Sequence, residues 1–593
     1  MIGSDDNGSV RASVPYRRWL ALGAILFLAA AVLGYWGFRE YYRAAGAARS
    51  WWDLVYLSMQ LFVLESGMVE GVAPWQLVLA RMLSAVFTVS TVILALGGIC
   101  RSELRALRLA CMARHDVVCG VGGKAWAVVR ELKRRNAPAV LVDPQVDRRM
   151  IRHFDRANMF VLEDDAKRPS CLEKARIRAA RRIFVATGDD SVNVEIVSQI
   201  INLFRARGPL RRDHRPICYM HLVDRRTNEL FCRNHAFREA EALVDMRIFN
   251  VYDNAARLLW RKHLMGRGPL APDDSRRMRV VLCGMDPMTE AILLRIAKSG
   301  HFANGRKPAV EIVGTGAGVL REKLRACHPM LESICDLEVV DGDADEPQVV
   351  QRIAENLGAA DDIGSVVLCA DQDHRNFATA LQLASAFAGL RTPVFVRLSL
   401  AEGLAALLAE KRSESGAASP VAAFGLVSDC CGEKIIVEDA LSSFAKRFHQ
   451  AYVRNRLQAG IPATDVSMKG WEDLDEQFRN SSREQAEHME LKLRTFGFSA
   501  DPACKKVPAQ FTPEQVHLLG RMEHARWCAE RWLSGWSYAP PPKDAIRHTS
   551  PYLVSWEDLD KSVQEIDFET VREIPAVLAG MEGALRPVTA SEG

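Results

Sequence analysis

The sequence predicts a two-helix membrane module, two α/β units in tandem and a mainly α-helical C-terminal region. Two uncharged apolar runs, Trp19–Phe38 and Met82–Cys100, are 20 and 19 residues long. Each can cross the roughly 30 Å hydrocarbon core of a membrane as a helix. A strand followed by a glycine-rich turn begins at Asp116, and a related pattern returns at Met278. After about residue 431, apolar residues recur at helical spacing.

Length, charge and cysteine content set further limits. A chain of 593 residues is too long for one core, and we place four units at 1–115, 116–270, 271–430 and 431–593. The net charge is only +4, and no basic stripe dominates, so we do not expect a nucleic acid partner. Fourteen cysteines without paired spacing indicate free thiols in a reducing compartment.

Arginines flank the apolar runs in a way that predicts cytoplasmic N- and C-termini. The flanking arginines are Arg11, Arg17 and Arg18 before the first run, and Arg101, Arg105, Arg108 and Arg114 after the second. Three arginines in the intervening loop weaken this inference. The first run could alternatively be a signal peptide, because small residues at 44–48 resemble a cleavage region. Since the run is long and a second span follows, we expect a multi-pass protein of a bacterial-type inner membrane.

A third apolar run, Leu54–Leu64, lies between the two spans and is too short to cross a membrane. It suits a re-entrant segment, placed at 54–67, or an interfacial helix. This layout resembles the two-helix pore module of tetrameric potassium channels. That family has a Thr-Val-Gly-Tyr-Gly filter, whereas residues 62–67 here read Phe-Val-Leu-Glu-Ser-Gly, so potassium selectivity is not implied. The pore residues we expect are Glu65, Ser66 and Gly67. A ring of Glu65 side chains would favour cations, unless Glu65 is a solvated loop residue.

The first α/β unit has the glycine pattern of a dinucleotide-binding Rossmann fold. Strand 116–119 runs into Gly120-Val121-Gly122-Gly123-Lys124-Ala125, and a second strand ends at Asp143. Gly120 permits the tight turn, Gly122 lets the backbone approach a pyrophosphate, and Ala125 allows close helix packing. The helix N-terminus favours the anion, and Asp143 is placed to bond ribose hydroxyls. We therefore expect NAD or another adenine nucleotide here, the alternative being a structural Rossmann unit with an empty cleft.

The continuation of this unit carries a family resemblance. Segments Glu163–Ala166, Leu172–Ala175 and Ile183–Asn193 resemble the TrkA-N nucleotide-binding fold of RCK domains and TrkA-type potassium-uptake regulators, over about 116–257. The resemblance implies a bound nucleotide such as NAD(H) or ATP, with Asp165 among the cofactor-binding residues. It also implies assembly into a gating ring, so we expect a homotetramer with eight Rossmann units.

The second α/β unit repeats the pattern with altered residues. Its first turn reads Gly284-Met285-Asp286-Pro287-Met288-Thr289, which puts a carboxylate where a pyrophosphate would sit. The next strand, Val310–Val313, ends in Gly314 instead of an acid. We interpret this unit as degenerate, with a structural role or a different ligand.

The C-terminal region combines helical patterning with a cluster of aromatic and charged residues. Helices are expected over Val437–Arg454 and Arg483–Phe496, and a further helix begins at Thr512-Pro513-Glu514. The region resembles the RyR (ryanodine receptor repeat) domain over about 433–579. Its markers are Glu523-His524-Ala525-Arg526-Trp527, Glu530-Arg531, Gly535-Trp536, Ser550–Val554, Trp471 and Asn480–Gln485. The resemblance implies recognition of nucleotide-derived signals, including in bacterial antiviral systems.

Aromatic rings can stack on a base, and arginines can grip phosphate oxygens. The ligand-binding residues we expect in the RyR-like region are Arg526, Trp527, Arg531, Trp536 and Tyr538. The alternative is that the two tryptophans belong to the core, while Arg526, Glu530 and Arg531 form surface ion pairs.

The order of these units predicts a ligand-gated membrane ion channel or channel-like effector that a nucleotide-type ligand opens or closes. We do not expect the protein to be an enzyme. His524 and Cys528 share a helix face, but no third ligand accompanies them, so no metal is expected. Sequence motifs of serine hydrolases, zinc proteases and P-loop proteins are missing. The alternatives are a membrane-disrupting effector without a selective pore and a membrane-tethered NAD-utilising enzyme.

Overall fold

The computed structural model divides the chain into two compact units, Met1–Met112 and Ala113–Gly593. We treat each unit by itself. The structure describes residues 14–47, 49–63, 65, 69, 72–146, 158–208, 210, 214–233, 243–267, 271–359, 362–387, 392–401, 403–408, 421–432, 440–460, 462, 465–474, 476–499, 507, 510–544 and 546–579. Of the expected pore residues, Glu65 is described, and Ser66 and Gly67 lie outside the described residues.

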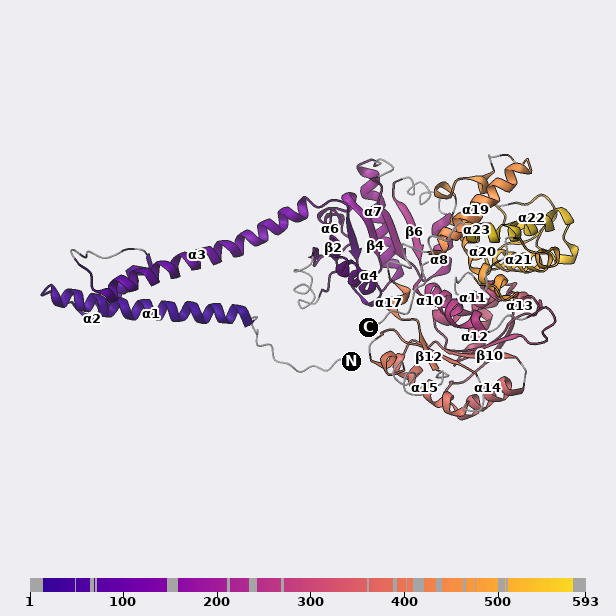
Figure 1. Ribbon diagram of the computed structural model, residues 1–593, viewed down its shortest axis with the longest axis horizontal. Helices are drawn as coiled ribbons and strands as arrows, with labels where there is room; N and C mark the ends of the chain where they lie inside the picture. Colours follow the sequence, from indigo (N-terminus) through magenta and orange to yellow (C-terminus); the bar gives the residue numbers. More distant parts are fainter. Residues whose placement is uncertain are drawn as a thin grey trace. The chain divides into compact units, whose positions relative to one another are not determined.

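The first unit is a hairpin of two long helices. Helix α1 (Val14–Ala44) and helix α3 (Trp75–Ala110) run side by side, and the short helix α2 (Trp51–Gln60) lies at the closed end (Figure 1). A 3₁₀ turn, Leu61–Val63, continues α2. Both expected spans fall within α1 and α3. The short apolar run between them is largely helical, as a re-entrant or interfacial helix requires.

Small residues allow the hairpin to pack closely. A Cβ atom on Gly37 would lie only 2.7 Å from the backbone nitrogen of Leu77, so α1 and α3 touch at this level. Phe38, Leu54 and Leu77 form a small buried core, and the Thr88 hydroxyl donates to the Phe62 carbonyl at 2.8 Å. The inner face of the hairpin is therefore occupied by its own side chains.

The outer faces of both helices are apolar and exposed. Segments Leu22–Ala44 and Trp75–Ile93 are long and apolar enough to cross a membrane, and most of their residues are not buried. The exposed apolar side chains are Leu22, Ile25, Leu28, Val32 and Trp36 on α1, and Val78, Leu79, Met82, Val86, Val89, Val92 and Ile93 on α3. A helix buried in a soluble core would hide such a stripe, whereas a helix in lipid exposes it.

The second unit begins with a six-stranded parallel sheet in the order β3-β2-β1-β4-β5-β6. Its strands are β1 (His115–Cys119), β2 (Ala139–Val142), β3 (Met159–Leu162), β4 (Ala180–Val185), β5 (Ile217–His221) and β6 (Asp245–Phe249). Its main helices are α4 (Gly123–Arg134), α6 (Pro169–Lys174), α7 (Asp190–Ala206) and α8 (Arg225–Arg233). β1 and β2 are buried throughout, as expected for a sheet covered on both faces. This strand order confirms a Rossmann fold.

The second sheet repeats the topology in the order β12-β11-β10-β7-β8-β9, again parallel. Its strands are β7 (Met278–Cys283), β8 (Ala309–Val313), β9 (Asp336–Val340), β10 (Ile363–Leu368), β11 (Val394–Arg397) and β12 (Val421–Phe424). Helices α11 (Pro287–Ser299) and α12 (Ala317–Cys327) lie on one side, and α14 (Pro347–Ala359) and α15 (Asp373–Ala386) on the other (Figure 1). The tandem Rossmann prediction is therefore confirmed for both units.

The C-terminal region is mainly helical, as expected. Its helices are α19 (Ala440–Gln458), α20 (Glu476–Arg494), α21 (Pro513–Leu533), α22 (Lys561–Arg572) and α23 (Ile574–Ala579), with a small sheet of β13 (Ser537–Tyr538) and β14 (Thr549–Ser550). Thr512 caps α21 in a capping box with Gln515, which confirms the predicted helix start.

The C-terminal helices share one hydrophobic core with the Rossmann units. Helix α10 (Val251–Leu259) connects the two sheets and packs on α11, and α11 in turn packs on α20 and α21. Leu259, Leu293, Leu491 and Leu519 from these four helices belong to the same buried cluster. The C-terminal region therefore packs on the second Rossmann unit and is not a separate domain with its own core.

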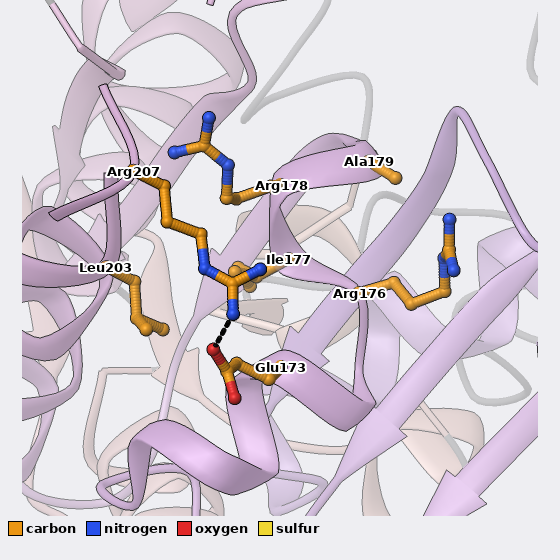
Figure 2. Close-up of a pocket in the computed structure, with 7 residues that line it drawn as sticks. All are labelled: Glu173, Arg176, Ile177, Arg178, Ala179, Leu203 and Arg207. Atoms are coloured by element: carbon orange, nitrogen blue, oxygen red, sulfur yellow. Dashed lines mark hydrogen bonds and ion pairs between the residues drawn. The ribbon is translucent and has the colours of Figure 1, made fainter. Parts of the chain in front are cut away.

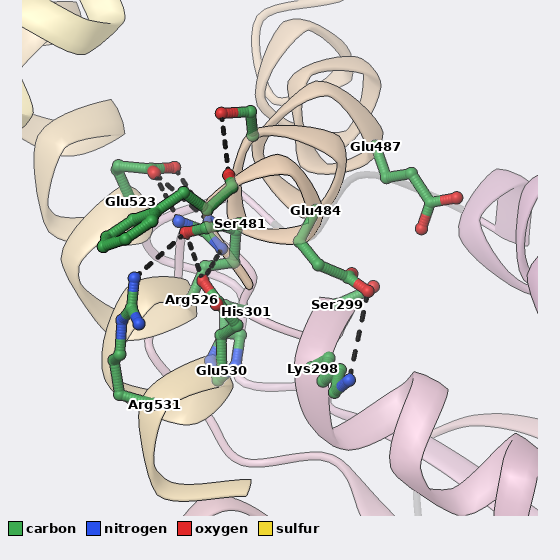
Figure 3. Close-up of polar contacts among 12 residues, drawn as sticks. Lys298, Ser299, His301, Ser481, Glu484, Glu487, Glu523, Arg526, Glu530 and Arg531 are labelled. Atoms are coloured by element: carbon green, nitrogen blue, oxygen red, sulfur yellow. Dashed lines mark hydrogen bonds and ion pairs between the residues drawn. The ribbon is translucent and has the colours of Figure 1, made fainter. Parts of the chain in front are cut away.

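Buried ion pairs cross this shared core. Arg295 of α11 makes a two-pronged contact with Glu484 of α20, at 2.6 and 3.1 Å, and a further bond to Glu487. Arg257 of α10 also pairs with Glu487, whose side chain is fully buried. Burial alone would raise the pKa of Glu484, but Arg295 outweighs it and lowers that pKa to about 2. Figure 3 shows Glu484 of α20 facing Lys298 near the end of α11, while Glu487 points away from Lys298.

We expect Glu487→Ala to destabilise the full-length protein by about 3–5 kcal/mol, because both arginines would keep their charges without this buried partner. Thermal and denaturant unfolding in detergent would measure the effect. Glu472→Ala is the matched control, since Glu472 pairs with Lys446 on an exposed surface, where such pairs contribute about 0–1 kcal/mol. Equal unfolding midpoints for the two variants would contradict this assignment.

Candidate functional site

The glycine turn of the first Rossmann unit forms an open cradle. Gly120 has φ +90°, and a Cβ atom there would lie 3.1 Å from the carbonyl oxygen of Ala186, so the turn needs glycine. Gly122 caps the N-terminus of α4, and Gly122, Gly123 and Gly188 each face open space where a side chain would stand. Free backbone N–H groups at a helix N-terminus with open space in front of them suit a phosphate group.

Asp143 closes the cradle at the end of β2. Its carboxylate accepts hydrogen bonds from the backbone N–H groups of Val121, at 2.7 Å, and Gln145, at 2.8 Å. The structure thus brings Gly120, Gly122 and Asp143 together, as the sequence predicts. Ala125 lies in the first turn of α4 and is fully buried, which allows close helix–sheet packing.

Asp165 lies in the turn after β3, at the same edge of the parallel sheet as Asp143. It follows β3, which is two strands from β1, and it accepts the backbone N–H of Lys167 at 2.9 Å. The Lys167 ammonium lies 3.8 Å from the same carboxylate. These contacts give Asp165 a local turn-forming role, and its part in nucleotide binding stays a prediction.

A polar cluster at the start of α7, which the sequence analysis did not assign, borders the cradle. Asn193 accepts the backbone N–H of Thr187 at 2.9 Å and donates to the His221 carbonyl at 3.0 Å. Asp190 accepts two backbone N–H groups after β5, those of Val223 and Asp224, each at 2.8 Å. The sequence signal was the Thr-Gly-Asp-Asp-Ser-Val-Asn segment that follows β4. These bonds fix the ends of β4 and β5 beside the glycine turn.

Lys124 is a second residue that the sequence analysis left without a role. It is the second residue of α4, directly after the glycine pair, and its ammonium lies 5.7 Å from the ring centre of Tyr252. Partial burial lowers the pKa of Lys124, and the Asp190 carboxylate opposes that shift. A partly desolvated ammonium at this position can neutralise a phosphate bound on the cradle.

The equivalent turn of the second unit is filled by its own side chains. A Cβ atom on Gly314 would lie 2.5 Å from Met285 Cγ, so Met285 covers the end of β8, where the first unit has Asp143 at the end of β2. Arg397 pairs with Asp371 at 2.7 Å. Burial raises the pKa of Asp286, and the nearby Asp371 carboxylate raises it further. This filled turn agrees with the interpretation of a degenerate unit.

The C-terminal region encloses a cavity of about 460 Å³. Its lining includes polar, charged and aromatic side chains from α19, α20, α21 and α22. The charged and aromatic lining residues include Arg456, Asp465, Glu523, His524, Arg526, Trp527, Arg531, Trp536, Lys543, Tyr552, Asp567 and Glu573. Four of the five expected ligand residues line this cavity. The fifth, Tyr538, is 56% exposed on β13 and is not among the lining residues.

Arg526 and its partners are buried, which corrects the expectation of surface ion pairs. The Arg526 guanidinium contacts Glu523 at 2.8 Å and Glu530 at 3.1 Å, and Arg526 is only 2% exposed. Lys492 of α20 also pairs with Glu523, and Ser481 donates to Glu530 (Figure 3). Because α21 is packed between neighbouring helices, its charged face turns inward. The Arg526 fork is therefore engaged by carboxylates within the protein.

Arg531 lies against aromatic rings. Its guanidinium carbon is 5.8 Å from the ring centre of Trp527 and 5.1 Å from that of Trp536. His548 stacks on Trp536 at 5.2 Å, and Trp536 is only 4% exposed. Trp536 thus has the burial that the core alternative expects, while Trp527 is half-buried.

His524 has acceptors at both ring nitrogens. Nε2 lies 3.0 Å from the Val554 carbonyl, and Nδ1 lies 3.4 Å from the Asp567 carboxylate. Burial alone would lower the pKa of His524, but Asp567 and Cys528 reverse this and raise it to about 10. No group of three or more His, Cys, Asp or Glu side chains able to hold a metal occurs in the described part of the chain.

A smaller pocket, of about 230 Å³, lies near the N-terminal end of β4 (Figure 2). The glycine turn borders the opposite end of this strand. Arg207 pairs with Glu173, and Arg178 donates to the Gly208 carbonyl at 3.1 and 3.2 Å. These contacts hold the end of α7 against the segment after α6, so the arginines have structural partners.

Part of the first Rossmann unit matches the model of a known domain family. Residues 117–208 match the TrkA-N domain. An uncharacterized protein of Methanothermus fervidus is 29% identical over 89 residues, which cover 15% of this chain and 14% of that protein. This chain therefore spans about a seventh of that relative's length.

Solved structures of the GsuK channel are also similar. The ADP-bound form is 16% identical with a TM-score of 0.38, covering 72% of this chain and 98% of that chain. The NAD-bound form is 13% identical with a TM-score of 0.38, covering 70% and 82%.

We expect Gly122→Asp to abolish binding of NAD to the full-length protein in calorimetry. Gly122 has φ −68° and faces open space, so the new side chain fits the fold but places a negative charge where a phosphate would bind. Gly122→Asn, which is similar in size but neutral, should retain more affinity. Unchanged affinity of Gly122→Asp would show that the cradle is not the site.

Proposed function

We propose that this protein is a membrane ion channel, or a channel-like effector, gated by nucleotide-type ligands. The observation that supports this best is the open glycine cradle with Asp143 and Lys124, in a chain that also holds two long helices with exposed apolar faces. A nucleotide site can regulate a membrane event only if it lies on the same molecule or complex, and this chain combines both parts.

The ligand of the cradle is an adenine nucleotide such as NAD or ADP. The cradle and Lys124 suit the phosphates, and Asp143 is placed for ribose hydroxyls. The second unit does not take the same ligand, because Met285 and the Asp371–Arg397 pair occupy its turn. The nucleotide is bound and not consumed in this proposal. Incubating the purified protein with NAD and measuring turnover tests it against the rival of an NAD-utilising enzyme.

The pore is formed by four copies of the helix hairpin, with the soluble units on the cytoplasmic side. The exposed apolar stripes on α1 and α3 provide surface for lipid and for neighbouring copies. Glu65 follows the 3₁₀ turn after α2, where a re-entrant segment would reverse toward α3. Four carboxylates at this level would favour cations without the carbonyl cage that selects potassium.

The C-terminal cavity is the principal sensor and binds a nucleotide-derived messenger. Its helices share a core and buried ion pairs with α10 and α11, so a change in the cavity reaches both Rossmann units through packed elements. Moving a pore from 1:99 to 99:1 requires about 5.5 kcal/mol of differential binding, or about 1.4 kcal/mol at each of four sites. A role in bacterial antiviral signalling belongs to this proposal and is based on the RyR-like markers.

In planar bilayers, we expect the protein to conduct cations with weak discrimination between potassium and sodium. Glu65→Gln should lower the preference for cations over anions, because it removes the carboxylate ring but keeps side-chain size. Glu40→Gln is a control, since Glu40 is bonded to Gln76 within the hairpin. Strong potassium selectivity would contradict the pore proposal, and large unselective leakage that ignores Glu65→Gln would favour a membrane-disrupting effector.

A further inference from the structure

Three cationic side chains from separate segments line the C-terminal cavity. They are Arg456 near the end of α19, Arg531 near the end of α21, and Lys543 in the loop after β13. The Lys543 ammonium lies 5.4 Å from the ring centre of Trp536, the same ring that Arg531 contacts at 5.1 Å. One indole therefore holds two cations close together at the wall of the cavity.

Most acidic groups in the lining have partners on the protein. Glu523 pairs with Lys492 and Arg526, and Asp567 lies against His524. In the same way, Asp465 accepts the backbone N–H of Ser467 at 2.8 Å, and Glu573 pairs with Arg454 at 2.7 Å. These carboxylates are used within the fold, so the charge available to a ligand comes from the cations.

Arg456 supplies an independent observation. Its Nε atom is enclosed, yet it has no hydrogen-bond partner among the described residues. Enclosed donors of a charged group almost always bind an acceptor, because a buried donor without a bond loses its hydration and gains nothing in exchange. An anion in the cavity would satisfy this donor.

The aromatic rings of the cavity differ in what already covers them. Trp536 carries His548, Arg531 and Lys543, and Trp527 stacks with His524 at 6.1 Å. Tyr552 lines the cavity and is 37% exposed. A planar ring can therefore stack on Tyr552, while Trp536 acts as a platform for cations.

We propose that the cavity binds a phosphorylated ligand with a planar base, the phosphate on Arg456, Arg531 and Lys543 and the base on Tyr552. This rests on the proposed function, because it specifies the chemistry of the sensor site named there. A cavity of about 460 Å³ is in the size range of small-molecule sites. Arginine forks and a lysine ammonium are the usual partners of phosphate oxygens.

The test is calorimetry on the full-length protein in detergent carrying Gly122→Asp, which removes binding at the first cradle. The probes are AMP, ribose 5-phosphate, adenosine and inorganic phosphate. We expect AMP to bind most tightly, ribose 5-phosphate more weakly because it lacks the base, and adenosine at least tenfold more weakly than AMP. Inorganic phosphate as tight as AMP would show a simple anion site and overturn the assignment of Tyr552, and no binding of any probe would overturn the proposal.

Charge and ring variants locate the two parts of the site. Arg456→Gln should weaken AMP binding about 10- to 100-fold, the range for one charge-assisted contact. Tyr552→Leu should weaken AMP but not ribose 5-phosphate. The control Arg547→Gln removes an exposed cation from the same loop as Lys543 and should change nothing. Unchanged AMP affinity of Arg456→Gln would overturn the proposal.

The pH dependence gives a further readout. The pKa of Lys543 is lowered to about 8, first because its ammonium is withdrawn from water and second because Arg531 lies nearby. The side chain as a whole stays accessible. The other charged groups facing it are Arg456, Asp465 and Glu530. AMP affinity should therefore fall between pH 7 and 9 as Lys543 loses its charge, and Lys543→Arg should flatten this fall. An affinity that does not change over this range would exclude Lys543 from the site.

NAD binding by the same variants without Gly122→Asp separates this proposal from the first cradle. A variant that still binds NAD is folded, so a loss of AMP binding then belongs to the cavity. If AMP binds the cavity but NAD binds nowhere, the cradle assignment fails and this one stands. If NAD binds normally and AMP never does, the reverse holds.

Discussion

The packing of the unit Ala113–Gly593 depends on the burial of Arg257 and Arg295 against Glu484 and Glu487. Taking an ion out of water costs several kcal/mol, so each of these groups is stable only while its partner is in place. Because the partners come from α10, α11 and α20, the charge requirement links the connection between the two sheets to the C-terminal helices. Truncation after Cys431 would uncover this core and leave two arginines without their carboxylates, so single substitutions in the cavity are the cleaner way to study the sensor.

Two units with one topology have become unequal through a few turn residues. Both sheets have the strand order 3-2-1-4-5-6, and both first turns use a glycine at positive φ, Gly120 and Gly284. In the first Rossmann unit, the space beyond the glycine turn is open, and Asp143 lies at its edge. In the second, Met285 covers Gly314. The fold is therefore kept by the buried strands, while ligand capacity is decided by side chains that the fold does not need.

The C-terminal cavity shows why residue type alone is a poor guide to a binding role. Arg526 has the chemistry to bind phosphate, but its guanidinium is engaged by Glu523 and Glu530. Trp536 has the surface to stack on a base, but it carries His548 and two cations. The groups that face the cavity with capacity to spare for a ligand include Arg456 and Tyr552. Arg456 lies outside the markers that first drew attention to this region, and Tyr552 belongs to the Ser550–Val554 marker but was not among the expected ligand-binding residues.

The sequence by itself determined the apolar helices, both Rossmann folds, the glycine cradle with Asp143 and the start of α21. These features depend on the local spacing of residues and on backbone geometry that glycine, proline or a capping residue dictates. The sequence could not show that Arg526 is buried. Nor could it join Arg456, Arg531 and Lys543 in one cavity. Those outcomes depend on contacts between segments far apart in sequence, of the kind that joins Arg257 to Glu487, 230 positions from each other. Burial and charge pairing of this kind are properties of the packed molecule, since each partner's solvation is set only when the helices meet.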